Sequence, residues 1–476
     1  MGRDQKDDPR LSRLPREPID RVTGPLARFL RIETTGSLVL LLAVAAALAL
    51  SNSPLADGFL AAWETPIGVQ LGPLALVHPT RDWINDGLMA LFFFVVALEL
   101  KRELVLGELR NPRVAALSVA AALGGMLAPA ALYLALQLGQ PGERGWGTVM
   151  ATDTAFVIGC LALLGRRAPQ GLRVFLLALA VVDDLGAILV VAIGYSSALD
   201  WAALAVGSVG LAVVRGMALL GVRSVPVYVL VGVLVWLAID ASGIHPTVTG
   251  VALGLLTPTR GWVSDRRLRA ILGRVLAHPP GGGGPWSGDA EDRWALRSAG
   301  KAAREALSPV ERFEAALHPW VAFGVMPLFA LANAGVPLSL DALTDSVVLA
   351  VMAGFVLGKP IGVVAFAWLA VRSGLAARPA ELGWGALAGG GMLAGIGFTM
   401  ALFIAGLAFQ GALLDAAKLG ILGASVLSAA GGLALLAWLA RGGGDRLAVA
   451  DDRRGHRTDG ARQDGRGQGQ IPLAKG

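Results

Sequence analysis

The sequence predicts an all-α integral membrane protein with 12 transmembrane helices. Of its 476 residues, 55% are apolar and only 16% are charged, and the mean hydropathy is +0.62. Soluble domains carry about a quarter charged residues, so the composition excludes that class. The single cysteine, Cys160, excludes an intrachain disulfide and a cysteine-based zinc site.

Apolar runs long enough to span a bilayer recur along the chain, and the seventh and eighth are the shortest. The predicted spans are 34–52, 84–106, 114–138, 147–164, 171–195, 201–219, 225–240, 245–258, 318–337, 344–371, 383–409 and 413–440.

The distribution of basic residues gives these spans an orientation. If the spans alternate in direction, both tails and every even-numbered loop lie on one side of the membrane. Nearly all of the 41 Lys and Arg fall in those regions, whereas Arg81, Arg144 and Lys418 fall on the other side and Lys359 falls inside a span. The positive-inside rule then places both termini in the cytoplasm.

The regions outside the spans predict the domain organisation. We expect residues 1–31 to be a disordered cytoplasmic arm, 32–440 the transmembrane domain, and 441–476 a disordered cytoplasmic tail. The long loop 259–313 contains a Gly and Pro run, and we expect it to be cytoplasmic and largely disordered. These basic stretches lack interleaved aromatic residues, so we predict no nucleic-acid partner.

The first loop between spans has a different pattern. Short alternating apolar runs flank Gly72-Pro73, which predicts a β-hairpin near 63–76. The exposed edge of such a hairpin can pair with a second copy of the chain, so we predict a homodimer.

Two of the predicted spans contain helix-breaking residues. In the fourth, Asp153 lies between Thr152 and Thr154, whose side chains compete for backbone hydrogen bonds. The eleventh contains the glycine-rich stretch 389–397, which indicates either a second break or close helix packing. Each broken span is the middle one of a triplet, spans three to five and ten to twelve, so the two triplets compare as two halves of the chain. Such paired interruptions are typical of a transporter's binding site.

Charged residues inside the spans are the strongest functional signal. Asp183 and Asp184 lie in the middle of the fifth span, where each ionised Asp costs roughly 2.5–3.5 kcal/mol. Lys359 lies within the tenth span. We expect its side chain to pair with one of the two acids of the fifth span rather than to extend to the membrane interface. Neighbours on a helix point about 100° apart, so we expect one acid to bind a cation and the other to contact Lys359. Asp153 and Lys359 are also the available counter-charges for the ends of the broken helices.

Other classes of function fit the sequence less well. None of the five histidines has the spacing of a metal-hydrolase ligand set, and one asymmetric acid–lysine site is unlike the ring of ligands in a cation channel. Asp86 has either a structural role or a role in the ion pathway. We expect His245 to be a hydrogen-bonded interface residue and Asn333 to bond a neighbouring helix.

Several motifs together resemble those of the bacterial NhaA sodium/proton antiporters, over residues 25 to 440. The runs that carry this resemblance are Trp83-Ile84-Asn85-Asp86-Gly87-Leu88-Met89-Ala90, Leu98-Glu99-Leu100-Lys101-Arg102-Glu103-Leu104, Ala151-Thr152-Asp153-Thr154-Ala155-Phe156, Val182-Asp183-Asp184-Leu185-Gly186-Ala187-Ile188, Pro327-Leu328-Phe329-Ala330-Leu331-Ala332-Asn333-Ala334-Gly335-Val336, Gly358-Lys359-Pro360 and Gly395-Ile396-Gly397-Phe398-Thr399-Met400. The resemblance implies inverted repeats, with the broken fourth and eleventh helices crossing in mid-membrane.

The resemblance implies a secondary transporter of the bacterial inner membrane rather than an enzyme. It implies exchange of cytoplasmic Na+ or Li+ for external H+, with no cofactor, in a dimer formed through the first hairpin. Two adjacent acids favour more than one proton per sodium, and therefore electrogenic exchange.

By position, the resemblance also implies roles for single residues. Asp184 matches the main cation ligand, and Asp183 matches the second essential acid, paired with Lys359. Asp153 and Thr152 match the residues at the crossing of the broken helices. A cytoplasmic pH-sensing cluster matches Glu99, Glu103, Glu314 and His318. The sequence departs from the pattern of that cluster at Ala315, where a histidine is expected, which leaves the pH set-point open.

Overall fold

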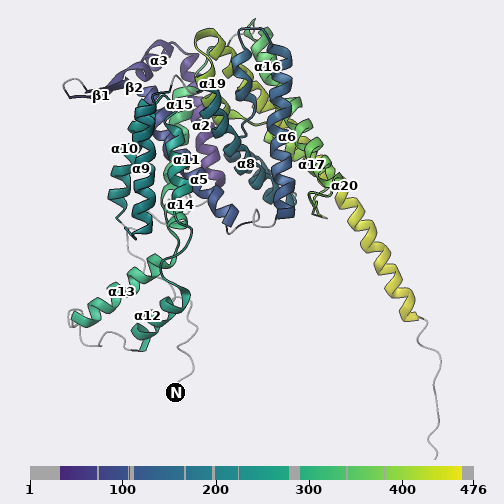
Figure 1. Ribbon diagram of the computed structural model, residues 1–476. Helices are drawn as coiled ribbons and strands as arrows, with labels where there is room; N and C mark the ends of the chain where they lie inside the picture. Colours follow the sequence, from purple (N-terminus) through teal and green to yellow (C-terminus); the bar gives the residue numbers. More distant parts are fainter. Residues whose placement is uncertain are drawn as a thin grey trace, which may run out of the picture.

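The protein forms one large helical bundle with a small β-hairpin at its edge (Figure 1). The computed structural model describes residues 33–463 except 72–73, 106, 108–111, 166–167, 196–198, 223, 278–289, 339–340 and 380. The predicted arm 1–31 therefore lies outside the described residues.

The first half of the bundle consists of α2 (Glu33–Ser51), α3 (Ala56–Glu64), β1 (Pro66–Leu71), β2 (Leu74–Pro79), α4 (Thr80–Asp82), η1 (Trp83–Leu88), α5 (Met89–Val105), α6 (Pro112–Gln137), η3 (Glu143–Val149), α7 (Thr154–Leu164), α8 (Gln170–Gly194), α9 (Trp201–Leu219), α10 (Val225–Ala241) and α11 (Thr247–Leu256). The second half consists of α12 (Asp265–Ala277), α13 (Ala290–Ala306), α14 (Pro309–Trp320), η5 (Val321–Val325), α15 (Met326–Asn333), η6 (Asp341–Thr344), α16 (Ser346–Ala353), η7 (Gly354–Gly358), α17 (Lys359–Arg372), α18 (Trp384–Ala394), α19 (Phe398–Ala408) and α20 (Gly411–Gln463).

The helices confirm an all-α membrane protein. By length and composition, the described residues contain 7 helices that could cross a membrane, or up to 10 if each of three bent pairs is one span. The shorter apolar helices α10 and α11 occupy the seventh and eighth predicted segments. Every predicted segment thus coincides with helix, whereas the number 12 and the inverted repeat remain predictions.

Small residues let pairs of helices approach closely. A Cβ added to Gly124 of α6 would overlap the carbonyl oxygen of Gly362 in α17, and the reverse substitution would overlap the carbonyl of Gly124. A Cβ added to Gly250 of α11 would likewise overlap the carbonyl oxygen of Ala90 in α5. Without side chains between them, these backbones pack in direct contact. The α6–α17 contact fixes the helix that begins at Lys359 against its neighbour.

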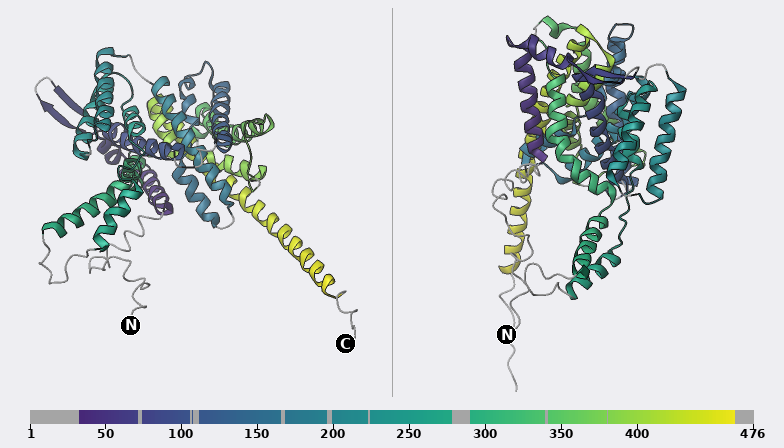
Figure 2. Two further views of the ribbon diagram at one scale, coloured as in Figure 1. Left: turned by 60° about the horizontal axis from the view of Figure 1, so that its bottom comes forward. Right: turned by 90° about the vertical axis from the view of Figure 1, so that its left-hand side faces the viewer.

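The predicted hairpin is present between α3 and α4. Strands β1 and β2 pair antiparallel, from Pro66 opposite Pro79 to Leu71 opposite Leu74. Trp83 Nε1 donates to the Ile67 carbonyl at 2.7 Å, which ties the hairpin to the start of the next membrane helix. Figure 2 shows the strands projecting from one edge of the bundle. The homodimer remains a prediction.

The long loop 259–313 differs from the expected disorder because it contains two helices, α12 and α13. Leu268, Ile271, Leu272 and Val275 recur at helical spacing in α12, which gives this segment an apolar side. The Gly and Pro run that suggested disorder falls within 278–289, outside the described residues.

The last helix also extends beyond its predicted limits. α20 continues to Gln463, past the predicted boundary at 440. Lys418, which charge counting assigned to a loop, lies inside α20 with 7% of its surface exposed, and its Nζ donates to the Gly335 carbonyl at 3.3 Å. That assignment was wrong because counting bases beside apolar runs does not show where a helix begins.

The α6–α17 contact predicts the effect of one added methyl group. Gly362→Ala must push the Gly124 carbonyl away, and overpacking of this kind typically costs about 1–3 kcal/mol. We therefore expect a lower unfolding temperature for the purified protein in detergent. Gly216→Ala on α9 is the matched control, since nothing lies within 4 Å of that Cβ position. Equal unfolding temperatures for the two variants would contradict this account of the packing.

Candidate cation-binding site

Two interrupted helices meet in the middle of the bundle. η3 and α7 are bent by 41° across residues 150–153, and α18 and α19 are bent by 47° across residues 395–397. The two breaks touch, since the backbone N–H of Asp153 donates to the Ile396 carbonyl at 2.7 Å. The predicted breaks in the fourth and eleventh segments are therefore present.

Local chemistry explains each break. Asp153 has extended backbone angles (φ −89°, ψ 97°), and its Oδ1 accepts the N–H of Phe156 at 3.3 Å as the N-cap of α7. In the other break, a Cβ on Gly395 or Gly397 would collide with Phe355. Both alternatives predicted for these glycines are therefore present, because the glycines lie at a helix break and also permit close helix packing.

The Asp153 carboxylate lies at two helix N-termini. Besides capping α7, its Oδ2 accepts the backbone N–H of Thr399 at 3.0 Å and the Thr399 hydroxyl. Thr399 is the second residue of α19, and both residues are buried, at 2% and 0% exposure. One negative group thus compensates the positive ends of two helices away from water.

The two facing C-terminal ends have polar partners as well. The Met150 carbonyl, just after η3, accepts a hydrogen bond from Lys359 Nζ. The Ala394 carbonyl, the last residue of α18, accepts one from Thr152 Oγ1 at 2.9 Å. Lys359 therefore brings positive charge to a negative helix end, and Thr152 brings a hydroxyl to the other.

Lys359 and Asp183 form a fully buried ion pair. Nζ lies 2.6 Å from Asp183 Oδ2, and both side chains have 0% exposure. The π-helical turn η7 ends immediately before Lys359, and such turns occur often at functional sites. Gly125 of α6 faces the lysine stem, where an added Cβ would lie 3.6 Å from Cε. The pair predicted from the sequence is thus present, held between α8 and α17.

The adjacent acid has no such partner. Asp184 is 6% exposed, and its Oδ1, like Asp183 Oδ1, is buried with no hydrogen-bond donor among the described residues. Thr152 Oγ1 lies 2.6 Å from Asp183 Oδ2, so its one hydroxyl proton faces both this oxygen and the Ala394 carbonyl. One oxygen of each of these two neighbouring acids is therefore without a hydrogen-bond donor among the described residues.

Side chains of α8, together with Tyr195 directly after it, hold both halves of the interrupted fourth segment. At one end, Arg173 Nη2 donates to the Gly165 carbonyl at 2.8 Å, where α7 ends. At the other end, Tyr195 donates its hydroxyl to the Arg144 carbonyl at 2.8 Å and accepts the Gly147 N–H at 3.3 Å. The helix with the double acid is thus fastened to the broken helix at three levels, the middle one being Thr152 with Asp183.

Neither a cluster of metal-ligating side chains nor the cavity between α7 and α8 surrounds the two acids, within the described residues. Among the described residues, no group of three or more His, Cys, Asp and Glu could hold a metal ion. Ligands beyond the two acids would have to be hydroxyl or carbonyl oxygens. A cavity of about 160 Å³ between α7 and α8 runs from Thr154 to Arg173 and does not include Asp183 or Asp184. The acids are therefore enclosed rather than set in an open cleft.

The residues matched to a pH-sensing cluster lie on α5 and α14. Arg102 lies between two of them, with Nη1 2.6 Å from Glu314 Oε1 and Nη2 3.4 Å from Glu103 Oε1. Glu99 lies on α5 with Glu103, and His318 lies on α14 with Glu314. The structure thus places all four residues on two helices and joins two of them, Glu103 and Glu314, through Arg102.

The remaining predicted residues have structural partners. Asn333 and Asn85 exchange amide hydrogen bonds at 2.8 and 3.4 Å, which confirms that Asn333 bonds a neighbouring helix. His245 Nδ1 lies 2.8 Å from Thr247 Oγ1 and its Nε2 lies 3.5 Å from Asp86 Oδ1. His245 is therefore hydrogen-bonded at an interface, as expected.

Sequence reasoning missed the partners of the essential groups. Thr399 lay in a quoted motif without a role, yet it binds Asp153 through both its backbone and its hydroxyl. Arg102 was not included with the acids that it bridges. The carbonyls of Met150 and Ala394 could not be identified, because every residue has a carbonyl.

Comparisons with known proteins agree with this geometry. The profile of the family described as Na+/H+ antiporter 1 matches residues 27–436. The chain is similar to the Na+/H+ antiporter NhaA 2 of Acidiphilium cryptum, with 67% identity over 93% of this chain and 98% of the relative. It is also similar to the Na+/H+ antiporter NhaA of Rhizobium meliloti, with 61% identity over 90% and 98%. The Na+/H+ antiporter NhaA 2 of Vibrio vulnificus is 55% identical over 90% of this chain and 96% of the relative.

A profile that matches most of the chain and relatives of this identity establish the family. The chain is a bacterial inner-membrane protein, and it belongs to the NhaA family of Na+/H+ antiporters.

Proposed function

We propose that this protein exports cytoplasmic Na+ or Li+ in exchange for external H+, with net movement of charge, for pH and sodium homeostasis. One observation carries this proposal. Two adjacent buried acids differ in their surroundings, since Asp183 is paired with Lys359 and Asp184 has an oxygen without a donor among the described residues. The relatives' names give Na+ and H+ as their ions.

Asp184 is the proposed main cation ligand. Sodium and lithium are hard cations that prefer oxygen ligands, as other hard cations do. Asp184 Oδ1 supplies an anionic oxygen, and Asp183 Oδ1 and the Thr152 hydroxyl lie on neighbouring positions of the same site. A bound cation satisfies the oxygens that no protein donor reaches.

Proton exchange follows from competition for these oxygens. A cation near Asp183 weakens its attraction to Lys359, and a proton on Asp183 removes that attraction altogether. Protonated Asp183 can also donate to Thr152 Oγ1, which leaves the Thr152 proton for the Ala394 carbonyl 2.9 Å away. Protons and the cation therefore compete for the same carboxylate oxygens, so binding of one disfavours binding of the other.

The proposed stoichiometry rests on the number of ionisable groups in the site. Asp183, Asp184 and Lys359 are all buried, and Asp183 and Lys359 form an ion pair, so emptying the site of a single-charged cation can involve two protonation events. More than one proton per sodium makes each cycle carry net charge. An inside-negative potential then contributes about 2.3 kcal/mol per net charge per 100 mV.

Two further roles rest on the same family assignment. We propose that Glu99, Glu103, Glu314 and His318 adjust transport to cytoplasmic pH. Arg102 bridges two of them, Glu103 and Glu314. The β1–β2 hairpin, with its exposed position beside α3, is the proposed contact of a homodimer.

The first prediction concerns Asp184. Asp184→Asn removes the anionic oxygen but keeps the shape, so Na+-dependent proton movement in everted vesicles should be lost while the unfolding temperature is retained. Ser118→Ala, which alters a buried polar group on α6, is the control. Transport with an unchanged half-saturation for Na+ in Asp184→Asn would rule out this ligand.

The second prediction concerns the buried pair. Lys359→Ala strands the Asp183 charge, and breaking such a pair typically costs about 3–5 kcal/mol. We expect a lower unfolding temperature and weak transport. Asp183→Asn in the Lys359→Ala background removes the stranded charge and should restore part of the stability but not the transport. If the double variant is as unstable as the sum of the single variants, the two residues are not coupled.

The third prediction concerns net charge. In proteoliposomes with valinomycin and a potassium gradient, an inside-negative potential should accelerate Na+ efflux, and reversing the potential should slow it. Apparent Na+ affinity should also fall as pH is lowered, because protons compete for the same carboxylates. Sodium flux that does not respond to the imposed potential means one-for-one exchange and contradicts the proposed stoichiometry.

A further inference from the structure

Helices α12 and α13 form a hairpin outside the bundle. Figure 1 shows it beyond the lower ends of α9, α10 and α14, with α13 lying across the direction of those helices. The backbone N–H groups of Trp262 and Val263 donate to the Glu305 carbonyl at 3.1 and 3.2 Å, which closes the base of the hairpin. The proposed transport chemistry uses none of its residues.

The inner face of the hairpin is small and apolar, while larger apolar groups are exposed. Ala299 and Ala302 of α13 are buried, at 8% and 4% exposure. By contrast, Trp294 is 70% exposed and Leu296 is 48% exposed. The large aromatic side chain of Trp294 is therefore exposed on the surface of the hairpin rather than packed inside it.

Basic residues accompany this tryptophan along one side of α13. At about 100° per residue, Trp294, Arg297, Lys301 and Arg304 fall within roughly a quarter turn of the helix. All four side chains are exposed. We call these four residues the basic stripe.

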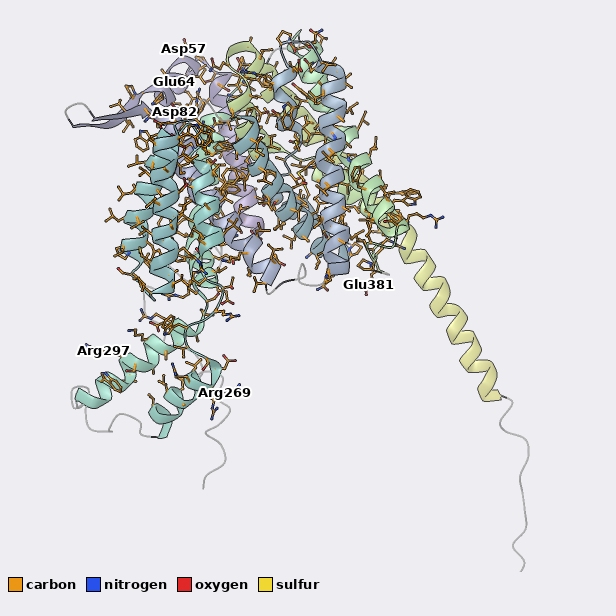
Figure 3. The ribbon with its side chains drawn as sticks, viewed as in Figure 1. Asp57, Glu64, Asp82, Arg269, Arg297 and Glu381 are labelled. Carbon is orange, nitrogen blue, oxygen red and sulfur yellow. The ribbon has the colours of Figure 1, made fainter. Side chains whose placement is uncertain are left out.

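The positive charge of the hairpin is not neutralised within the described part of the chain. Arg266, Arg267 and Arg269 of α12 are also exposed. Neither these arginines nor the bases of the basic stripe form an ion pair with any described residue. Figure 3 labels Arg269 and Arg297 on the two helices of the hairpin.

We propose that this hairpin binds the anionic phospholipid headgroups of the membrane in which the protein is embedded. The bases pair with phosphate groups, and Trp294 takes the interfacial position that tryptophan prefers. An amphipathic helix with bases on its polar side binds such a surface in this way. The positive-inside rule places the hairpin at the cytoplasmic leaflet.

The connections of the hairpin favour this surface over a distant partner. Residues 257–264 join α11 to α12, and residues 307–308 join α13 to α14. Two residues span at most about 7 Å, so the end of α13 stays close to the start of a membrane helix. The inference does not depend on the transported ion.

The test uses the full-length protein in lipid nanodiscs. Cys160→Ser removes the only cysteine, and Trp294→Cys then accepts an environment-sensitive fluorophore. We expect its emission to shift to the blue in discs that contain phosphatidylglycerol, relative to discs of phosphatidylcholine alone. High salt should reverse the shift, and so should Arg297→Gln with Lys301→Gln and Arg304→Gln.

Ala303→Cys is the matched control, because it is exposed on the same helix half a turn from Trp294. Its label should shift less than the label at position 294. Equal emission in the two kinds of disc, or equal shifts at both positions, would overturn the proposal. A shift produced by soluble heparin but not by phosphatidylglycerol would also overturn it, and would assign the basic stripe to a soluble acidic partner.

Discussion

The crossing of two interrupted helices is the constraint on which the rest of the structure depends. Four helix ends face each other away from water, and each end needs a polar or charged partner. Asp153 serves both N-termini, while Lys359 and Thr152 serve the two C-terminal carbonyls. Once Lys359 is there its own charge must be balanced, which accounts for Asp183. The acid pair and the breaks are therefore parts of one electrostatic arrangement.

Much of this arrangement could be predicted from the sequence because charges in apolar runs are costly. The charges inside the fifth and tenth spans favoured pairing of Lys359 with one of the two acids, and the Thr-Asp-Thr run indicated where the fourth helix breaks. Apolar run length located the long apolar helices, and Gly-Pro between alternating residues located the β1–β2 hairpin. Each of these signals is local and depends on residue type.

The partners that were missed carry no such signal. Thr399 and Asp153 lie far apart in the sequence, and a threonine in an apolar helix has many possible partners. Backbone carbonyls at helix ends are recognised only when the break is located to the residue. The α12–α13 hairpin was overlooked because the Gly and Pro run of 278–289 outweighed the helical spacing in its flanks.

The attachment of α8 to both halves of the broken fourth segment has a mechanical consequence. Arg173, Asp183 and Tyr195 fasten the two elements along their whole length. Relative sliding of α8 and the broken helix would break all of these contacts together, so the pair behaves as a rigid lever. We therefore expect any relative motion of helices during exchange to occur at the other faces of α8 and α7 rather than between these two elements.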